Sequence, residues 1–180
     1  MTGQNQGARE EQVVLVDIFD QALGSAEKLA AHNQGLLHRA FSIFLHDGER
    51  LLLQQRAPDK YHSGGLWANT CCSHPRPGEG LAEAAGRRLR EETGIDCPLQ
   101  PAFSFIYRHV FQSGLIEYEL DHVLLGRYGG AFSPDPAEIQ AMAYLPGQDL
   151  ARQLLSQPGR FAPWFICAAP RVLALLGLGR

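Results

Sequence analysis

The segment Gly78–Ile95, GEGLAEAAGRRLREETGI, is the most regular pattern in the chain. Its apolar residues Leu81, Ala85 and Leu89 recur every four positions and therefore fall on one stripe of an α-helix. Gly94 follows, and glycine suits the left-handed conformation that closes a helix because it has no Cβ. The sequence predicts a helix over residues 81–93 with one apolar face.

Two ionisable residues, Arg88 and Glu92, fall inside this apolar stripe. They can form an i,i+4 ion pair at the edge of the core. They can also present a carboxylate to a hard cation and a guanidinium to a phosphate. Glu83, Arg87 and Arg90 are expected on the opposite, solvated face. The helix alone leaves both interpretations of the inward pair open.

The remaining pattern indicates strands with few helices. We expect a strand over Val13–Phe19, a hairpin around His46–Glu49, a hairpin joining Phe103–Phe111 to Leu115–Leu125, a strand at Met142–Leu145, and helices around Asp149–Ser156 and from Pro163. Without regular βαβ alternation, this order predicts a mixed-sheet α/β or α+β fold. Residues 1–11 are polar and are predicted to form a disordered lead-in to a single domain over 12–180.

Composition limits the partners. The 180 residues carry 16 Lys and Arg against 19 Asp and Glu, a net charge of −3, which argues against a broad surface for nucleic acid or anionic membranes. No secretory signal is evident, and the longest apolar run, Val172–Leu178, is far too short to span a bilayer. Four cysteines without a recurring framework favour a reduced, cytoplasmic chain.

Acidic residues share one face of the segment 115–125. By the two-residue period of a strand, Glu117, Glu119 and Asp121 point the same way. Such a row is typical of the solvated face of an antiparallel strand. It is also what a cation site needs, because like charges repel unless a cation lies between them.

Imidazoles are available to complete such a site. His32, His38 and His74 are each more typical of a surface or hydrogen-bonding histidine than of a ligand. Together with two carboxylates they would make a five-ligand site for Mn²⁺, Mg²⁺ or Zn²⁺.

A thiol and several cations complete the list of candidates. Cys72 lies in a loop before the helix, where it is a candidate acid, base or nucleophile, although a lone cysteine is usually buried and inert. Basic residues flank the same loops, and if gathered around one pocket they would suit a small phosphorylated ligand. These are Lys28, Arg56, Lys60, Arg87, Arg88 and Arg108.

The helix and its surroundings resemble the Nudix box. Glu79 and the run Arg87–Ile95 follow its pattern, but Ser73 replaces its first glycine and Arg88 replaces its first metal-binding glutamate. The second replacement argues against ordinary pyrophosphate hydrolysis. Five segments in register are similar to the type I isopentenyl-diphosphate isomerases of the Nudix superfamily: Ala30–His32, Leu37–Ser42, Trp67–Pro75, Glu117–Glu119 and Pro163–Trp164.

The resemblance implies a Nudix-like mixed β-sheet sandwiched between helices, and a role for each matching residue. It implies a metal site of His32, His38, His74, Glu117 and Glu119, and a second position at Glu92 where Mg²⁺ also holds the substrate diphosphate. It implies catalytic roles for Cys72 and Glu119, with Tyr107 assisting. Lys28, Arg56, Lys60 and Arg88 would contact the diphosphate, and Trp164 would face a carbocation. The spacing between His32 and His38 is one residue shorter than we expect for the bacterial members of this family.

The activity implied is interconversion of isopentenyl and dimethylallyl diphosphate by moving a proton on and off the alkene, which supplies the allylic primer for isoprenoid biosynthesis. The partner would be a small prenyl diphosphate, with no nucleic acid or membrane, and the chain would be a monomer or weak homodimer. Two alternatives stand beside it: a Nudix hydrolase of a nucleoside or prenyl diphosphate, and a non-catalytic, metal-bound binding module.

Overall fold

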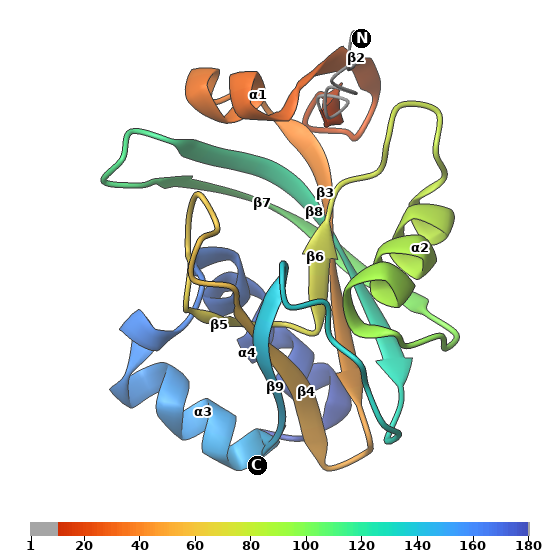
Figure 1. Cartoon of the computed structure of the whole chain (residues 1–180), viewed down its shortest axis with the longest axis vertical. Coiled ribbons are helices and arrows are strands. Elements are labelled where there is room, and N and C mark those ends of the chain that lie inside the picture. Colours follow the sequence, from red (N-terminus) through yellow and green to blue (C-terminus); the bar gives the residue numbers. More distant parts are fainter. Residues whose placement is uncertain (1–10, 180) are drawn as a thin grey trace, which may run out of the picture.

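The computed structural model describes residues 11–179 and shows a mixed β-sheet with helices against it (Figure 1). The strands are β1 (Gln12–Val16), β2 (Ala22–Glu27), β3 (His38–His46), β4 (Arg50–Arg56), β5 (Trp67–Ala68), β6 (Cys71–Ser73), β7 (Gln100–Val110), β8 (Ile116–Arg127) and β9 (Ile139–Pro146). The helices are α1 (Lys28–Gln34), α2 (Leu81–Thr93), α3 (Gly147–Ser156), α4 (Pro163–Leu176) and the short 3₁₀ turn Pro158–Arg160. The mixed α+β fold predicted from the sequence is confirmed.

Strand β3 organises the sheet. It pairs antiparallel with β1, β4 and β6, and parallel with β8 along its whole length. β7 extends the sheet beyond β8, and β9 pairs with β4. The parallel register places His38 opposite Glu119, so two candidate ligands from distant parts of the sequence become neighbours.

Two hydrophobic cores lie on opposite faces of this sheet, because successive strand residues point to opposite sides. Phe41, Ile43 and Leu45 of β3 belong to the core beneath α2. Phe44, between them, belongs to the core that contains Phe165 of α4, and the two rings stack at 5.7 Å between centroids. The sheet is therefore sandwiched between helices, as expected.

Helix α2 has the predicted bounds, Leu81–Thr93. Gly94 adopts the left-handed conformation, with φ of 70°, and its N–H donates to the Arg90 carbonyl. The side chain of Glu92 is buried, while Arg90 is exposed, as the helical wheel predicts. Arg87 departs from the prediction because it is only 19% exposed and is held by Glu79, so part of the expected solvated face is covered.

The structure confirms other predicted elements: the hairpin of β7 and β8, strand β9, and helices α3 and α4. Strand β9 is longer than expected. The first strand was predicted too long: it ends at Val16, and the chain turns at residues 17–21, which leaves Ile18 and Phe19 exposed. β2, α1, β5 and β6 were not predicted. Of the lead-in, only Glu11 is described, and its carboxylate binds Lys28 Nζ at 2.9 Å, while residues 1–10 lie outside the described part.

Helix α1 is short but well defined at both ends. The Glu27 carboxylate accepts hydrogen bonds from the N–H groups of Leu29 and Ala30, and Gly35 closes the helix with φ of 62°. This fixes the orientation of His32 in its last turn.

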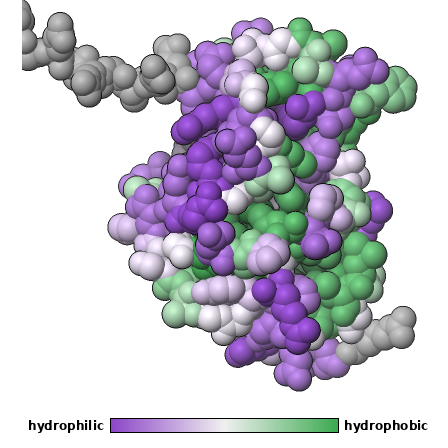
Figure 2. Space-filling model, turned by 90° about the vertical axis from the view of Figure 1, so that its right-hand side faces the viewer, coloured by the Kyte–Doolittle hydropathy of each residue, from purple (hydrophilic) through white to green (hydrophobic). Residues whose placement is uncertain are grey.

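Polar and apolar side chains both reach the surface of the molecule. Figure 2 shows hydrophilic residues gathered along one side of a face, with a hydrophobic region beside them. Within residues 11–179, no helix has the length and apolar character that crossing a bilayer requires.

Candidate active site

One cavity of about 570 Å³ gathers most of the residues proposed from the sequence. Strands β3 and β8 form its floor, and α1, α2, the segment 57–66 and the start of α4 contribute to its walls. Its lining includes Lys28, Arg56, Lys60, Cys72, His74, Arg88, Glu92, Glu117, Glu119 and Trp164. These ten residues come from eight separate elements or loops, and all of them face one space large enough for a small ligand.

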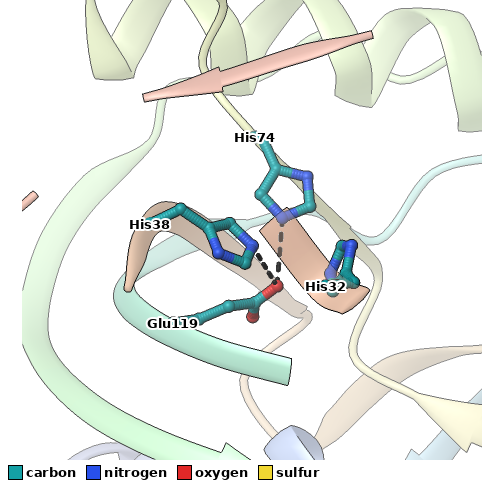
Figure 3. A group of neighbouring side chains, drawn as sticks. All are labelled: His32, His38, His74 and Glu119. Atoms are coloured by element: carbon teal, nitrogen blue, oxygen red, sulfur yellow. Dashed lines mark hydrogen bonds and ion pairs between the residues drawn. The ribbon is translucent and has the colours of Figure 1, made fainter. Parts of the chain in front are cut away.

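Four side chains converge beside this cavity (Figure 3). His32 comes from α1, His38 from β3, His74 from the segment after β6, and Glu119 from β8. Glu119 Oε1 lies 3.0 Å from His74 Nε2 and 3.5 Å from His38 Nε2, and one ligand atom from each of the four residues lies within 4.8 Å of the others. All four side chains are buried.

The backbone orients two of the imidazoles toward the centre. His32 Nδ1 lies 2.8 Å from the Lys28 carbonyl, and His38 Nδ1 lies 2.8 Å from the Leu36 carbonyl. Each Nδ1 must carry the proton to donate to a carbonyl, which leaves a lone pair on each Nε2. Both Nε2 atoms are buried and lack hydrogen-bond partners among the described residues. This donor set fits a divalent transition metal.

Local charges favour the protonation states that bind metal. Burial lowers the pKa of His32, and it lowers the pKa of His74 to about 4, so both imidazoles are neutral at neutral pH. Burial acts to raise the Glu119 pKa, but the neighbouring imidazoles of His38 and His74 outweigh it and hold that pKa well below its usual range. The site therefore offers neutral imidazoles and an ionised carboxylate.

The fifth predicted ligand, Glu117, is placed differently. It lies on the same face of β8 as Glu119, but its Oε1 contacts His62 Nε2 at 3.2 Å. Glu117, His62 and His32 form a second group with ligand atoms within 4.8 Å of one another. Glu117 is thus adjacent to the four-residue cluster through His32. His62 was not selected from the sequence.

The acidic face of β8 is buried. Glu117, Glu119 and Asp121 are 3%, 7% and 1% exposed, so its interpretation as a solvated strand face is wrong. β8 lies between β3 and β7, and the cavity covers this face. Burial, and then the nearby Glu119 charge, raise the pKa of Asp121 to about 8, and Ser42 Oγ donates to its Oδ2 at 2.7 Å.

A thiol and a hydrogen-bonded carboxylate face the same space. Glu119 Oε2 accepts a 2.6 Å hydrogen bond from Tyr107 Oη, and Cys72 lines the cavity. Burial raises the pKa of the Cys72 thiol to about 12 although Arg56 opposes the change, so the thiol keeps its proton at neutral pH. Cys71, its neighbour, is fully buried in the core under α2.

Five of the six basic residues noted in the sequence line the cavity; Arg108 does not belong to them and is exposed. Arg88 Nη2 lies 2.5 Å from Glu92 Oε1, so the i,i+4 ion pair is present as well as the cavity-facing position. Glu138, which sequence reasoning missed, contacts both Arg88 and Lys60. Because Glu138 lies in an irregular segment before β9, no periodic pattern marked it.

Trp164 forms an aromatic wall of the cavity. Its Nε1 donates to Asn69 Oδ1 at 3.0 Å, which fixes the buried ring. The Arg56 guanidinium lies over the ring at 5.2 Å from its centroid and points Nη1 at Cys72 Sγ, 3.9 Å away. The indole face is therefore already in contact with a cation.

Comparison with known proteins gives the family. A model of the NUDIX domain matches residues 36–165. The isopentenyl-diphosphate Delta-isomerase of Burkholderia multivorans is 50% identical over 163 residues, which cover 90% of this chain and 93% of the relative. A second isomerase, from Aromatoleum aromaticum, is 50% identical over 94% of this chain and 90% of its own length. The chain belongs to the isopentenyl-diphosphate Delta-isomerase family.

Solved structures confirm the fold of this family member. A crystal structure of a Deinococcus radiodurans protein superposes with a TM-score of 0.75 at 20% identity and covers 89% of this chain and 98% of the other. A MutT protein of Methanosarcina mazei gives 0.60 at 17% identity, covering 75% of this chain and 91% of its own. At these identities the likeness shows a shared Nudix fold.

Membership of the isomerase family fits the altered Nudix box. Arg88, in place of the first box glutamate, points its guanidinium at Glu92 and into the cavity. Helix α2 therefore presents the Arg88 guanidinium and the Glu92 carboxylate to the cavity, whereas the Nudix box has a glutamate at the position of Arg88. This exchange replaces a carboxylate by a guanidinium, which is a group suited to phosphate.

Proposed function

We propose that the chain interconverts isopentenyl diphosphate and dimethylallyl diphosphate, supplying the allylic primer for isoprenoid biosynthesis. Its relatives of about 50% identity bear the isomerase name and align over nearly their full length. The observation that supports the reaction most directly is a protonated thiol, Cys72, in the same cavity as the hydrogen-bonded carboxylate of Glu119. Moving a double bond requires one group that donates a proton and one that accepts a proton.

The reaction balances without a redox partner or water. The terminal methylene carbon of isopentenyl diphosphate gains a proton, and the electron pair of the C=C bond forms the new C–H bond. A tertiary carbocation remains on the adjacent carbon. Loss of a proton from the methylene on the diphosphate side returns an electron pair and places the double bond there.

Cys72 and Glu119 would exchange these two protons. Tyr107 Oη would hold the Glu119 carboxyl group in place through its 2.6 Å hydrogen bond. Burial, and then the Glu119 charge, raise the pKa of Tyr107, so its hydroxyl remains a donor. Trp164 would stabilise the carbocation by cation–π attraction, worth up to about 2 kcal/mol in a desolvated site.

The cationic side of the cavity would hold the diphosphate. Arg56, Arg88, Lys28 and Lys60 all line the cavity and would contact phosphate oxygens. Glu92 would hold the Mg²⁺ that accompanies the diphosphate. These contacts also oppose departure of the diphosphate from the allylic product.

The set His32, His38, His74, Glu117 and Glu119 would hold Mn²⁺, Mg²⁺ or Zn²⁺. The bound ion would supply a fixed positive charge that keeps Glu119 oriented toward the substrate. Metal analysis of the purified protein, with His32→Ala as the comparison, tests this assignment and identifies the ion.

We further propose that the enzyme works on its small prenyl diphosphate in the cytoplasm, as a monomer or weak homodimer. Light scattering over a range of concentrations tests the oligomeric state.

The activity is tested by incubating the protein with isopentenyl diphosphate and Mg²⁺. We expect the acid-labile allylic product and no released phosphate. Released phosphate would instead identify a Nudix hydrolase, and neither product would identify a binding module.

Two substitutions test the catalytic pair. Cys72→Ala and Glu119→Gln should each abolish isomerisation while the far-ultraviolet circular dichroism stays unchanged. Cys167→Ser and Glu83→Gln are matched controls, because both side chains are exposed and remain outside the cavity lining. Full activity in Cys72→Ala or Glu119→Gln would overturn the assignment.

A further inference from the structure

His62 is a partly buried histidine that the proposed reaction does not use. It lies between β4 and β5, and its side chain is 7% exposed. Its ring stacks on Phe111 at 4.9 Å and meets Trp164 edge-on at 6.0 Å. These aromatic contacts fix the ring so that Nε2 faces Glu117 Oε1 at 3.2 Å.

One carboxylate oxygen of Glu117 has a contact partner, and the other has none among the described residues. Its Oε1 contacts His62, whereas its Oε2 is buried and has no hydrogen-bond partner among the described residues. An unpartnered buried carboxylate oxygen is costly, because its hydration is lost without replacement. The neighbouring His32 Nε2 is likewise buried and unpartnered, and ligand atoms of these three residues lie within 4.8 Å of one another.

The pattern matches the way in which proteins orient metal ligands. A ligating carboxylate or imidazole generally uses one atom for the metal and the other for a hydrogen bond that fixes its direction. His32 and His38 already do so, since each is held through Nδ1 by a backbone carbonyl. A carboxylate that ligates a cation is ionised, so a ring nitrogen at hydrogen-bond distance from it must be the donor.

We propose that His62 is a positioning residue of the metal centre. Its Nε2–H donates to Glu117 Oε1 and thereby directs Oε2 toward the cation held by the imidazole cluster. His62 thus links the metal site to the aromatic wall, because the same ring contacts Trp164. The inference rests on the metal centre of the proposed function and concerns how its fifth ligand is held.

Two substitutions separate the hydrogen bond from packing. His62→Phe retains an aromatic ring against Phe111 and Trp164 but has no donor. His62→Gln loses the ring but keeps an N–H that can reach Glu117. If His62 acts by packing, His62→Gln should lower the metal affinity more than His62→Phe. If His62 positions Glu117, His62→Phe should lower it more.

The experiment measures Zn²⁺ and Mn²⁺ affinity by competition with a chromogenic chelator, so it needs no activity. We expect His62→Phe to weaken binding by about 10–100-fold and His62→Gln to remain close to the unsubstituted chain. The melting temperatures of the metal-free proteins should show that both variants fold. Unchanged affinity in His62→Phe, or an equal loss in both variants, would overturn the positioning role; the second result would indicate direct coordination by His62.

His32→Ala distinguishes a failure of the proposed metal centre from a failure of the positioning role of His62. If it loses metal while His62→Phe does not, the centre stands and only the role of His62 fails. If His32→Ala also retains full affinity, the proposed metal centre is wrong, and the role of His62 falls with it.

Discussion

The pair formed by Glu79 and Arg87 should contribute measurably to stability. Glu79 precedes α2, and its carboxylate accepts two hydrogen bonds from Arg87, at 2.6 and 2.8 Å, and one from the Arg76 backbone N–H at 3.0 Å. This ties the loop after His74 to the helix that carries Glu92. Glu79→Gln removes the charge and one acceptor oxygen while keeping the shape.

The size of this contribution to stability follows from the geometry and the exposure of the two side chains. The Glu79 and Arg87 side chains are 11% and 19% exposed, so the pair is better shielded than a surface salt bridge yet is not deeply buried. Charge-assisted, two-pronged hydrogen bonds of this kind contribute about 1.5–3 kcal/mol. We expect Glu79→Gln to lower the free energy of unfolding by about 2 kcal/mol, which for a chain of this size lowers Tm by about 4–8 °C.

The stabilisation by the Glu79–Arg87 pair should decrease as the pH falls. Hydrogen bonds from Arg87 lower the pKa of Glu79 from 4.5 to about 2 in the folded chain. A lowered pKa means that the stabilisation is complete above the unfolded pKa near 4.5 and is lost as the pH falls toward 2. The difference between Glu79→Gln and the unsubstituted chain should therefore be constant near neutrality and shrink below about pH 4.5.

Urea unfolding followed by circular dichroism measures these differences. Glu83→Gln is the matched control, because it makes the same charge change at an exposed position of α2. A double-mutant cycle with Arg87→Met isolates the pair. Two results would contradict this role of the pair. Glu79→Gln would lower the free energy of unfolding no more than Glu83→Gln does, or it would lower it equally when Arg87 has been replaced.

Two further predictions concern the cavity. Glu92→Gln should raise the Mg²⁺ concentration needed for half-maximal activity and weaken pyrophosphate binding measured by calorimetry; an unchanged Mg²⁺ titration would contradict the role of Glu92. Tyr107→Phe removes the donor to Glu119 and should lower kcat by at least about tenfold, while the bound-metal content measured by elemental analysis stays the same. A lower metal content would instead indicate that Tyr107 helps to hold the metal-binding side chains in place.

Periodic segments were predictable from the sequence. Helix α2 was predicted with its bounds because apolar spacing, inward charges and Gly94 all agree. The shared face of Glu117 and Glu119 followed from strand geometry, but their burial did not. It depends on β8 lying between two other strands and beneath the cavity, a tertiary arrangement that strand alternation does not contain.

Short or irregular segments escaped prediction. Helix α1 has only seven residues, and its start depends on the Glu27 side chain as a cap. Strands β5 and β6 have two and three residues and exist because β4 and β3 offer edges to pair with. His62 and Glu138 lie in such irregular segments, so their participation in the site became visible only in three dimensions.

The parallel pairing of β3 and β8 also sets an order of events during synthesis. His38 and Glu119 face each other across it, yet β4, β5, β6, α2 and β7 come between them in the chain. Distant strands pair late, because loop closure costs entropy before the contacts form. A nascent chain that ends before β8 already carries all three imidazoles but lacks the carboxylate that gathers them. Ion binding at the proposed metal centre would therefore require that translation has passed β8, so the ion would join a chain whose parallel strand pair is already complete.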